Sequence, residues 1–337
     1  MKAIGYYNPL PITAADSLVD LDIPAPAPGP RDLLVRVKAI SVNPVDVKVR
    51  AGVKPADGQA RVIGWDAAGV VEAVGPDVEL FKVGDEIFYS GTLNRPGSNA
   101  ELQAVDERLV GRKPASLSFE QAAALPLTAV TAWELLFDRL GIPPEDKTDK
   151  GTLLIINGAG GVGSILTQIA RQLTGLTVIA TASRPETTAW VKEMGAHHVI
   201  DHHKPLPESL KALGIPEVDY VAGLTATQQN LPAIVEILRP QGRLGLIDDP
   251  ETLDIAPFKR KSLSVHWELM FTRSIYQTSD MIAQHEILNR VSELVDQGVL
   301  RTTLKENFGT INAANLKAAH ASVESGKAIG KSVLAGF

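Results

Sequence analysis

Three glycines have the spacing that binds the pyrophosphate of a dinucleotide. The segment Asn157–Ser164 reads NGAGGVGS, which matches the pattern G-x-G-x-x-G. In that pattern Gly158 permits a tight turn, Gly160 lets a pyrophosphate approach the backbone, and Gly163 lets a helix pack closely on a strand. The free N–H groups at the start of that helix favour the phosphate charge. A purely structural turn is the alternative. We expect the dinucleotide contacts to come from Gly158, Gly160, Gly161, Val162 and Gly163.

The end of the next expected strand indicates which dinucleotide is bound. Sites for NAD usually carry an acidic residue about 20 positions further on, which accepts a hydrogen bond from the ribose 2′-hydroxyl. Here the segment Ala180–Pro185 reads ATASRP and contains no carboxylate. Ser183 can donate a hydrogen bond, and Arg184 is a fixed cation that can pair with a phosphate. The pattern favours NADPH, with a solvated surface arginine as the alternative reading of Arg184.

A regular alternation of strands and helices is expected to position these residues. An apolar strand over 152–157 precedes the glycines, a helix over 162–173 follows them, and a strand over 177–181 leads to Ser183. Continuous apolar strands between amphipathic helices predict a parallel sheet covered on both faces. The alternation continues with expected helices over 186–194 and 228–238 and expected strands over 197–200, 218–221 and 243–247.

The first 115 or so residues have a different pattern. Short strands over 33–40 and 69–75, and a turn followed by a strand within 81–89, are separated by glycine and proline turns and predict a small barrel or sandwich. Ser118 and Gln121 fit a capping box that opens a helical run to Leu140, with a break or kink expected at Pro126. The tail adds helix and then a strand over 331–335 that is expected to return to the first domain.

Composition and charge exclude several classes of protein. The chain has 337 residues, more than one core usually supports, so we expect two domains. It has no cysteine, which excludes disulfides, thiolate metal sites and cysteine nucleophiles. A net charge of −6 without a basic cluster argues against nucleic acid as a partner. No apolar run is long enough for a membrane span, and the first residues read as a strand rather than a signal peptide. A soluble, cytoplasmic protein is the expectation.

Nearly the whole chain resembles the medium-chain dehydrogenase/reductase superfamily. It looks most similar to the zinc-independent quinone oxidoreductase branch, close to a group labelled "zinc-type alcohol dehydrogenase-like". The resemblance rests on the order and spacing of five segments: VNPVD at 42–46, GWDAAGVV at 64–71, ALPLTAVTAW at 124–133, the glycine segment, and GK at 330–331.

The resemblance implies a fold class and a domain order. The class is α/β, with a GroES-like β-rich catalytic domain and a Rossmann domain built on a doubly wound parallel sheet. The implied boundaries are residues 1–122 for the catalytic domain, 123–265 for the Rossmann NADP-binding domain, and 266–337 for the C-terminal return to the catalytic domain.

The resemblance also implies roles for individual residues. Asn43 and Asp46 would line the nicotinamide end of the active cleft, and Thr128 would lie near the nicotinamide. His202 stands where relatives often have a tyrosine beside the adenosine phosphate. From the residues alone, Asp46 is equally well explained as a capping residue of a short turn at 45–50.

Metal chemistry is not expected. Zinc-dependent members of the superfamily have a cysteine near position 43 and Gly-His-Glu where this chain has Gly64-Trp65-Asp66. The run HHVIDHH at 197–203 contains legitimate ligands, but neighbouring residues of a strand point to opposite faces, so few of them can converge.

The function expected from the sequence is NADPH-dependent hydride transfer, without zinc, to a small-molecule quinone, enone or similar activated acceptor. Asn43 is the candidate donor to the oxygen that gains charge. An enoyl-thioester or alkenal reductase on the same scaffold is one alternative, and a catalytically silent NADPH-binding sensor is another. The resemblance further suggests a homodimer, joined along an edge strand near Ser262–His266.

Overall fold

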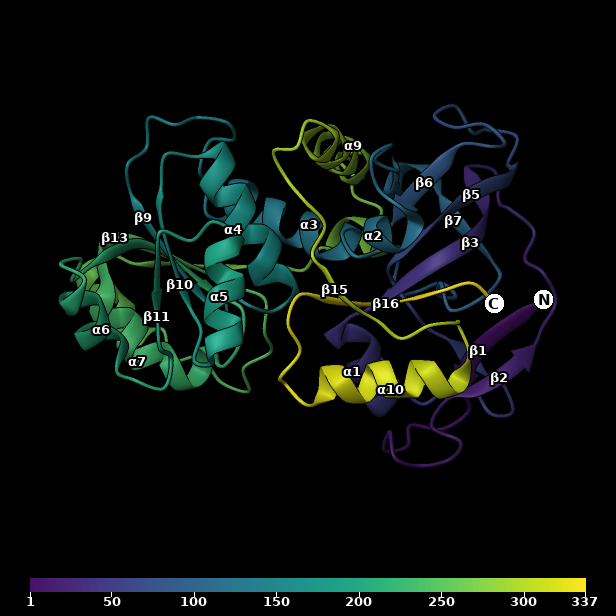
Figure 1. Cartoon of the computed structure of the whole chain (residues 1–337), viewed down its shortest axis with the longest axis horizontal. Coiled ribbons are helices and arrows are strands. Elements are labelled where there is room, and N and C mark those ends of the chain that lie inside the picture. The colour runs from purple at the N-terminus through teal and green to yellow at the C-terminus, as the bar shows by residue number, and fades with distance from the viewer. The chain divides into compact units, whose positions relative to one another are not determined.

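The computed structural model describes residues 1–337 and separates into two compact units. The first unit contains Met1–Val130 and Phe271–Phe337, and the second contains Thr131–Met270. In Figure 1 the first unit runs from purple to blue and returns in yellow, whereas the second is teal and green. The α/β class is confirmed, with an antiparallel-rich unit and a unit built on a parallel sheet.

Two sheets form the first unit. The larger has the order β15-β16-β3-β5-β6-β8, with β7 also paired to β3, and the smaller has the order β2-β1-β4. The strands are β1 (Lys2–Tyr6), β2 (Val19–Asp22), β3 (Asp32–Val42), β4 (Arg61–Val62), β5 (Ala67–Val74), β6 (Glu86–Tyr89), β7 (Leu102–Asp106), β8 (Val110–Arg112), β15 (Leu304–Asn307) and β16 (Lys331–Ala335). The C-terminal strand β16 pairs antiparallel with β3, as expected, so the chain ends inside the sheet that its first part builds (Figure 1).

Helices of the first unit lie around these sheets. They are α1 (Pro44–Gly52), the short 3₁₀ helix η1 (Glu107–Leu109), α2 (Phe119–Ala123), α8 (Thr272–Tyr276), α9 (Ala283–Asp296) and α10 (Ala313–Glu324). The expected capping box is present at α2, where Ser118 and Gln121 each accept a hydrogen bond from the other's backbone N–H. The helical run breaks at Pro126, where α3 (Pro126–Trp133) begins, and the division between the units falls within α3.

Six parallel strands form the sheet of the second unit, in the order β11-β10-β9-β12-β13-β14. They are β9 (Thr152–Ile156), β10 (Thr177–Thr181), β11 (His198–Ile200), β12 (Val218–Gly223), β13 (Leu238–Leu246) and β14 (Ser264–Trp267). The order reverses beside β9, as in doubly wound dinucleotide-binding sheets. Its helices are the π-helix η2 (Glu134–Arg139), α4 (Gly161–Leu173), α5 (Pro185–Glu193), α6 (Leu206–Ala212), α7 (Thr227–Ile237) and the 3₁₀ helix η3 (Ala256–Lys261).

Burial of β9 explains its continuous apolar sequence. Leu154 and Ile156 belong to the core cluster shared with α6 and α7. Leu153 and Ile155 are equally buried, and successive residues of a strand face opposite sides of the sheet. Figure 1 shows α4 and α5 together, with α6 and α7 grouped on the other side of the strands. Both faces of the sheet are therefore covered, and its carboxyl edge remains for a ligand.

No helix is long and apolar enough to cross a bilayer.

Candidate functional site

The glycine segment lies where β9 ends and α4 begins. Gly160 is the residue that precedes the first turn of α4, so the unpaired N–H groups of that turn follow it directly. Asn157 adopts a positive φ of 69° and turns the chain at the end of β9. The structure therefore forms the strand–turn–helix arrangement that the spacing predicts.

The three glycines of the motif have different surroundings. A Cβ at Gly163 would overlap the carbonyl oxygen of Asn157, and a Cβ at Gly158 would lie 2.7 Å from Cβ of Ala180. These two glycines therefore serve close packing. At Gly160 the three atoms nearest to an added Cβ all belong to the Asn157 side chain, at 3.1–3.7 Å. A Cβ at Gly160 would thus meet a side chain rather than packed backbone, which suits a glycine kept for the approach of a ligand.

A threonine that the sequence analysis did not single out joins the ends of the first strands. Thr181, the last residue of β10, accepts a hydrogen bond at Oγ1 from the backbone N–H of Asn157 (2.9 Å), and its carbonyl accepts from the N–H of Gly158 (3.0 Å). Nδ1 of His202 lies 3.3 Å from the same Oγ1. The glycine turn, the end of β10 and His202 are therefore brought together at the carboxyl edge of the sheet.

Ser183 and Arg184 follow Thr181 after one intervening residue, Ala182. Both are half-buried, and Arg184 precedes the first turn of α5. Its guanidinium lies 3.3 Å from the exposed carboxylate of Glu186. Residues 180–185 contain no carboxylate, but that of Glu186 lies just beyond them, beside the expected phosphate partner Arg184.

The residues expected at the substrate end lie in the first unit. Asn43 caps α1, and its backbone N–H donates to Oδ2 of Asp46 at 2.5 Å. The segment 45–50, expected as a short turn, is part of the nine-residue helix α1. Asp46 therefore does cap the helix, as its alternative reading held. Thr128 is buried, and its hydroxyl donates to the carbonyl of Leu125 at 3.1 Å.

Asn43 also belongs to a buried network that the sequence analysis missed. Its side-chain Nδ2 donates to Oδ2 of Asp66 at 2.8 Å, and its Oδ1 accepts from Nζ of Lys331 at 2.5 Å. Nζ of Lys331 also donates to the carbonyl of Val42 (2.9 Å) and lies 3.2 Å from Oδ2 of Asp66. The backbone N–H of Leu127 donates to the other oxygen of Asp66 at 2.8 Å.

The network holds two acidic side chains and one ammonium without access to solvent. Burial raises the pKa of Asp46 to about 7, against the opposing effects of its hydrogen bond from Asn43 and of Lys331. Burial also raises the pKa of Asp66, and Lys331 opposes the rise. Every hydrogen-bond partner of Asp66 described above is a donor, so Asp66 has the surroundings of a carboxylate. Asp46, whose Oδ1 has no partner, is the acid that titrates near neutral pH.

A second buried acidic cluster lies in the second unit. Glu134 opens the π-helix η2, and Glu268 follows the edge strand β14; both side chains are fully buried. Arg139 reaches both carboxylates, at 2.8 Å from Glu268 and 3.6 Å from Glu134. Burial, and then the charge of Glu134, raise the pKa of Glu268 to about 9.

This pair predicts a pH-dependent stability. Because the folded-state pKa of Glu268 lies above its ordinary value of 4.5, folding retains a proton that the unfolded chain releases. The free energy of unfolding should therefore fall as the pH rises from about 5 to 9, by at most about 1.4 kcal/mol per pH unit. Glu268→Gln should reduce the pH dependence of the free energy of unfolding. Glu208→Gln, which alters an exposed carboxylate, should leave that pH dependence unchanged. Urea unfolding at several pH values measures the slopes, and equal slopes for wild type and Glu268→Gln would contradict the assignment.

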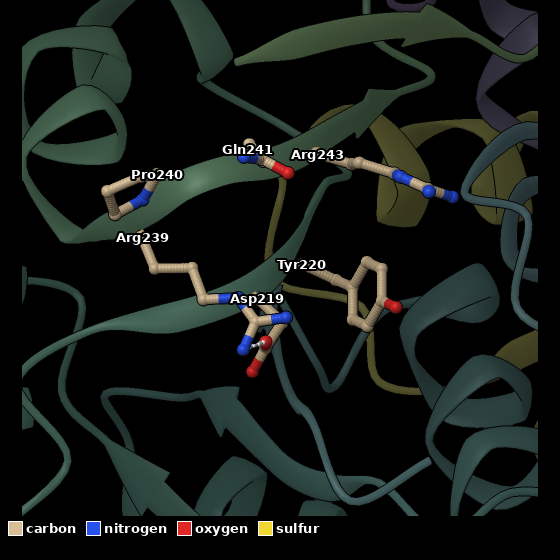
Figure 2. Close-up of a pocket in the computed structure, with 6 residues that line it drawn as sticks. All are labelled: Asp219, Tyr220, Arg239, Pro240, Gln241 and Arg243. Atoms are coloured by element: carbon tan, nitrogen blue, oxygen red, sulfur yellow. Dashed lines mark ion pairs between the residues drawn. The ribbon is translucent and has the colours of Figure 1, made fainter. Parts of the chain in front are cut away.

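A cavity of about 450 Å³ lies at the opposite, amino edge of the second unit's sheet. It is lined by Asp219, Tyr220, Arg239, Pro240, Gln241 and Arg243 at the starts of β12 and β13 (Figure 2). Arg239 forms an ion pair with Asp219 there, and Arg243 donates a hydrogen bond to the carbonyl of Leu140. The cavity is therefore separate from the glycine turn and is not a candidate cofactor site.

Known proteins match this chain over its whole length. Residues 29–117 match the alcohol dehydrogenase GroES-like domain, and residues 194–334 match the zinc-binding dehydrogenase family. A "zinc-type alcohol dehydrogenase-like protein" of Staphylococcus epidermidis is 42% identical over 99% of both chains. The chain belongs to the medium-chain dehydrogenase/reductase superfamily. It is an oxidoreductase of that superfamily, whose dehydrogenases bind a nicotinamide cofactor.

Two solved structures show how far the likeness extends. A putative zinc-dependent alcohol dehydrogenase from Rhizobium etli is 57% identical, with a TM-score of 0.95 over 100% of this chain and 98% of that one. A quinone oxidoreductase from Pseudomonas syringae is 27% identical, with a TM-score of 0.84 over 99% of each chain.

The zinc in these names has no matching ligand set here. The chain has no cysteine, and no group of three histidine, aspartate or glutamate side chains is placed to hold a metal ion. Within the run 197–203, Nδ1 of His197 instead accepts from the backbone N–H of Val178. The residues present do not fit a zinc site, whereas the turn at Gly160 does fit a dinucleotide.

Proposed function

We propose that this member of the superfamily is a zinc-independent reductase that uses NADPH to reduce a quinone, an enone or a similar activated acceptor. The observation that carries the proposal is the set of groups gathered at the end of β10. The glycine turn, Thr181 and His202 meet there, and Ser183 and Arg184 follow in place of the acid typical of NAD sites. The likeness to the Pseudomonas syringae quinone oxidoreductase supports the acceptor class.

The residues of the second unit would bind and orient the cofactor. The N–H groups at the start of α4 would hold the pyrophosphate, and Arg184 would pair with the adenosine phosphate. A bound nicotinamide supplies a hydride from C4. Thr128 is proposed to lie near that ring.

Charge that develops on the acceptor's oxygen needs a hydrogen-bond donor in the absence of a metal. The Asn43 amide carries two N–H hydrogens, of which Asp66 accepts one. The Asn43 side chain is buried in this structure, and its remaining N–H is proposed to serve the acceptor oxygen once a bound acceptor reaches it. The proton that completes the reduction comes either from water or from Asp46, the buried acid of this network.

Steady-state oxidation of NADPH against three acceptor series tests the proposal. Quinones and simple enones should turn over, whereas preferential turnover of enoyl thioesters would assign the alternative reductase activity. Activity should survive treatment with EDTA, because no zinc ligand set is present. No turnover with any acceptor would leave an NADPH-binding sensor and contradict the proposed reaction.

We also propose a homodimer joined along β14, the edge strand of its sheet. The N–H of Glu268 points to β13, so by strand alternation the N–H of Trp267 points outward, and the Trp267 side chain is 53% exposed. Proline is tolerated where a strand N–H faces solvent, so Trp267→Pro should spare the fold and block edge pairing. Sedimentation velocity at micromolar concentration should show a dimer for wild type and a monomer for Trp267→Pro. A monomeric wild type would contradict the dimer.

A further inference from the structure

Lys331 is a buried lysine whose three N–H donors all have oxygen partners. It begins β16, is 3% exposed, and reaches the Val42 carbonyl, the Asn43 amide oxygen and the Asp66 carboxylate. An ammonium has exactly three hydrogens to donate, so this environment satisfies it completely. No hydrogen remains for a ligand, and Lys331 can therefore act only through its partners.

The partners of Asn43 set the orientation of its amide. An amide side chain presents an acceptor and a donor of similar shape, and its two orientations differ only in which end meets which neighbour. Lys331 can only donate and the Asp66 carboxylate can only accept. The amide oxygen must therefore face Lys331 and the amide nitrogen must face Asp66, as the structure shows.

We propose that Lys331 is a positioning residue, which fixes the Asn43 amide so that the N–H that Asp66 does not accept meets the oxygen of the acceptor. This inference rests on the proposed reductase function and assigns a role to a residue from the far end of the chain. Asp66 completes the arrangement, because it also accepts from the N–H of Leu127, the neighbour of Thr128. Asn43 and the start of α3 are thus held to one carboxylate.

Lys331 also balances the charge of that carboxylate. Removing the ammonium would leave Asp66 buried without its counterion, which is strongly destabilising in general. A loss of activity in a Lys331 variant would therefore be ambiguous unless the effects on stability and on orientation were separated. The chain offers a way to separate them, because the charge can be rebalanced at Asp66.

The first variant is Lys331→Met, which keeps the length of the side chain and removes its charge and donors. We expect kcat with a quinone or enone to fall by up to about 100-fold, which a misplacement of about 1 Å can cost in a reacting complex. The dissociation constant for NADPH, measured by titration, should stay within about twofold of wild type, because the glycine turn and Arg184 lie in the other unit.

The double variant Lys331→Met/Asp66→Asn restores neutrality without restoring the orientation. The Leu127 N–H requires the oxygen of an amide at position 66, which leaves the amide nitrogen facing Asn43, so the nitrogen of Asn43 is no longer held toward position 66. We expect the thermal midpoint to return toward that of wild type while kcat stays low. Arg50→Met is the matched control, because Arg50 is 1% exposed, paired with Glu324 and outside the network. It should lower the thermal midpoint and leave kcat within about twofold.

The outcomes separate this inference from the proposed function. Turnover by wild type with an unchanged kcat in Lys331→Met contradicts the role of Lys331 alone. Recovery of kcat together with the thermal midpoint in the double variant assigns Lys331 a purely structural role and also overturns the inference. An absence of turnover in wild type contradicts the proposed function, and the inference falls with it.

Discussion

Gly160→Val should abolish the binding of NADPH and leave the chain folded. The valine side chain would stand where the pyrophosphate approaches the backbone, and the protein atoms nearest to its Cβ are those of the Asn157 side chain. Wild type should gain about 2.7 kcal/mol of stability at a hundredfold excess of NADPH over its dissociation constant. The variant should have a near-normal thermal midpoint without NADPH and show no shift with it.

Gly163→Ala is the matched control for this prediction. A Cβ at Gly163 would overlap the backbone of Asn157, so this variant should lose stability even without a ligand. The two variants should thus have different effects: Gly160→Val should lose the binding of the cofactor, and Gly163→Ala should lose stability because the helix packs less well on the strand. If Gly160→Val kept the full NADPH-induced shift, the assignment of the glycine turn to the cofactor would be wrong.

Arg184→Ala should weaken NADPH and leave NADH nearly unchanged. A hydrogen bond to a charged group contributes about 1.5–3 kcal/mol, and the partial exposure of Arg184 places the effect toward the lower figure, about a tenfold loss. Fluorescence titration with each dinucleotide measures the change. Wild type should prefer NADPH, and equal affinities for both dinucleotides would contradict the assignment of Arg184.

Glu186→Gln tests whether the carboxylate beside Arg184 opposes the binding of the phosphate. The Glu186 carboxylate lies 3.3 Å from the Arg184 guanidinium and would repel a phosphate bound there. We therefore expect Glu186→Gln to bind NADPH at least as tightly as wild type. A selective loss of NADH binding would show instead that Glu186 acts as the ribose-binding acid.

The second unit's fold could be predicted well because its signals are local. The strands at 152–156 and 177–181 and the helix at 161–173 lie within a residue of their expected positions, since each carries its own apolar pattern and flanking glycines. Helix α1 was expected only as a short turn. Pro44 and Asp46 mark its start, but its sequence is polar and lies between strands, so no apolar periodicity identified it.

The site residues, like the elements of the fold, differ in whether a local sequence signal identifies them. Gly158, Gly160 and Gly163 lie within one short segment of the chain, and their spacing alone indicates the turn. Lys331 and Asp66 form their contacts across long stretches of chain, with strand β16 pairing to β3, and a single sequence does not indicate which distant residues pair. Only the charge of Lys331 at the head of an apolar strand, SVLA, hinted that it has a buried partner.

Isotope transfer tests the central claim, which is direct delivery of a hydride from NADPH to the acceptor. NADPH deuterated at C4 should be mixed with the enzyme and an enone in ordinary water, because a deuterium bound to the β-carbon of the product does not exchange. We expect one deuterium at that carbon for each NADPH that carries the label at the transferring position, and none in reactions without enzyme. A saturated product without deuterium at the β-carbon, formed with NADPH deuterated on either face, would contradict it.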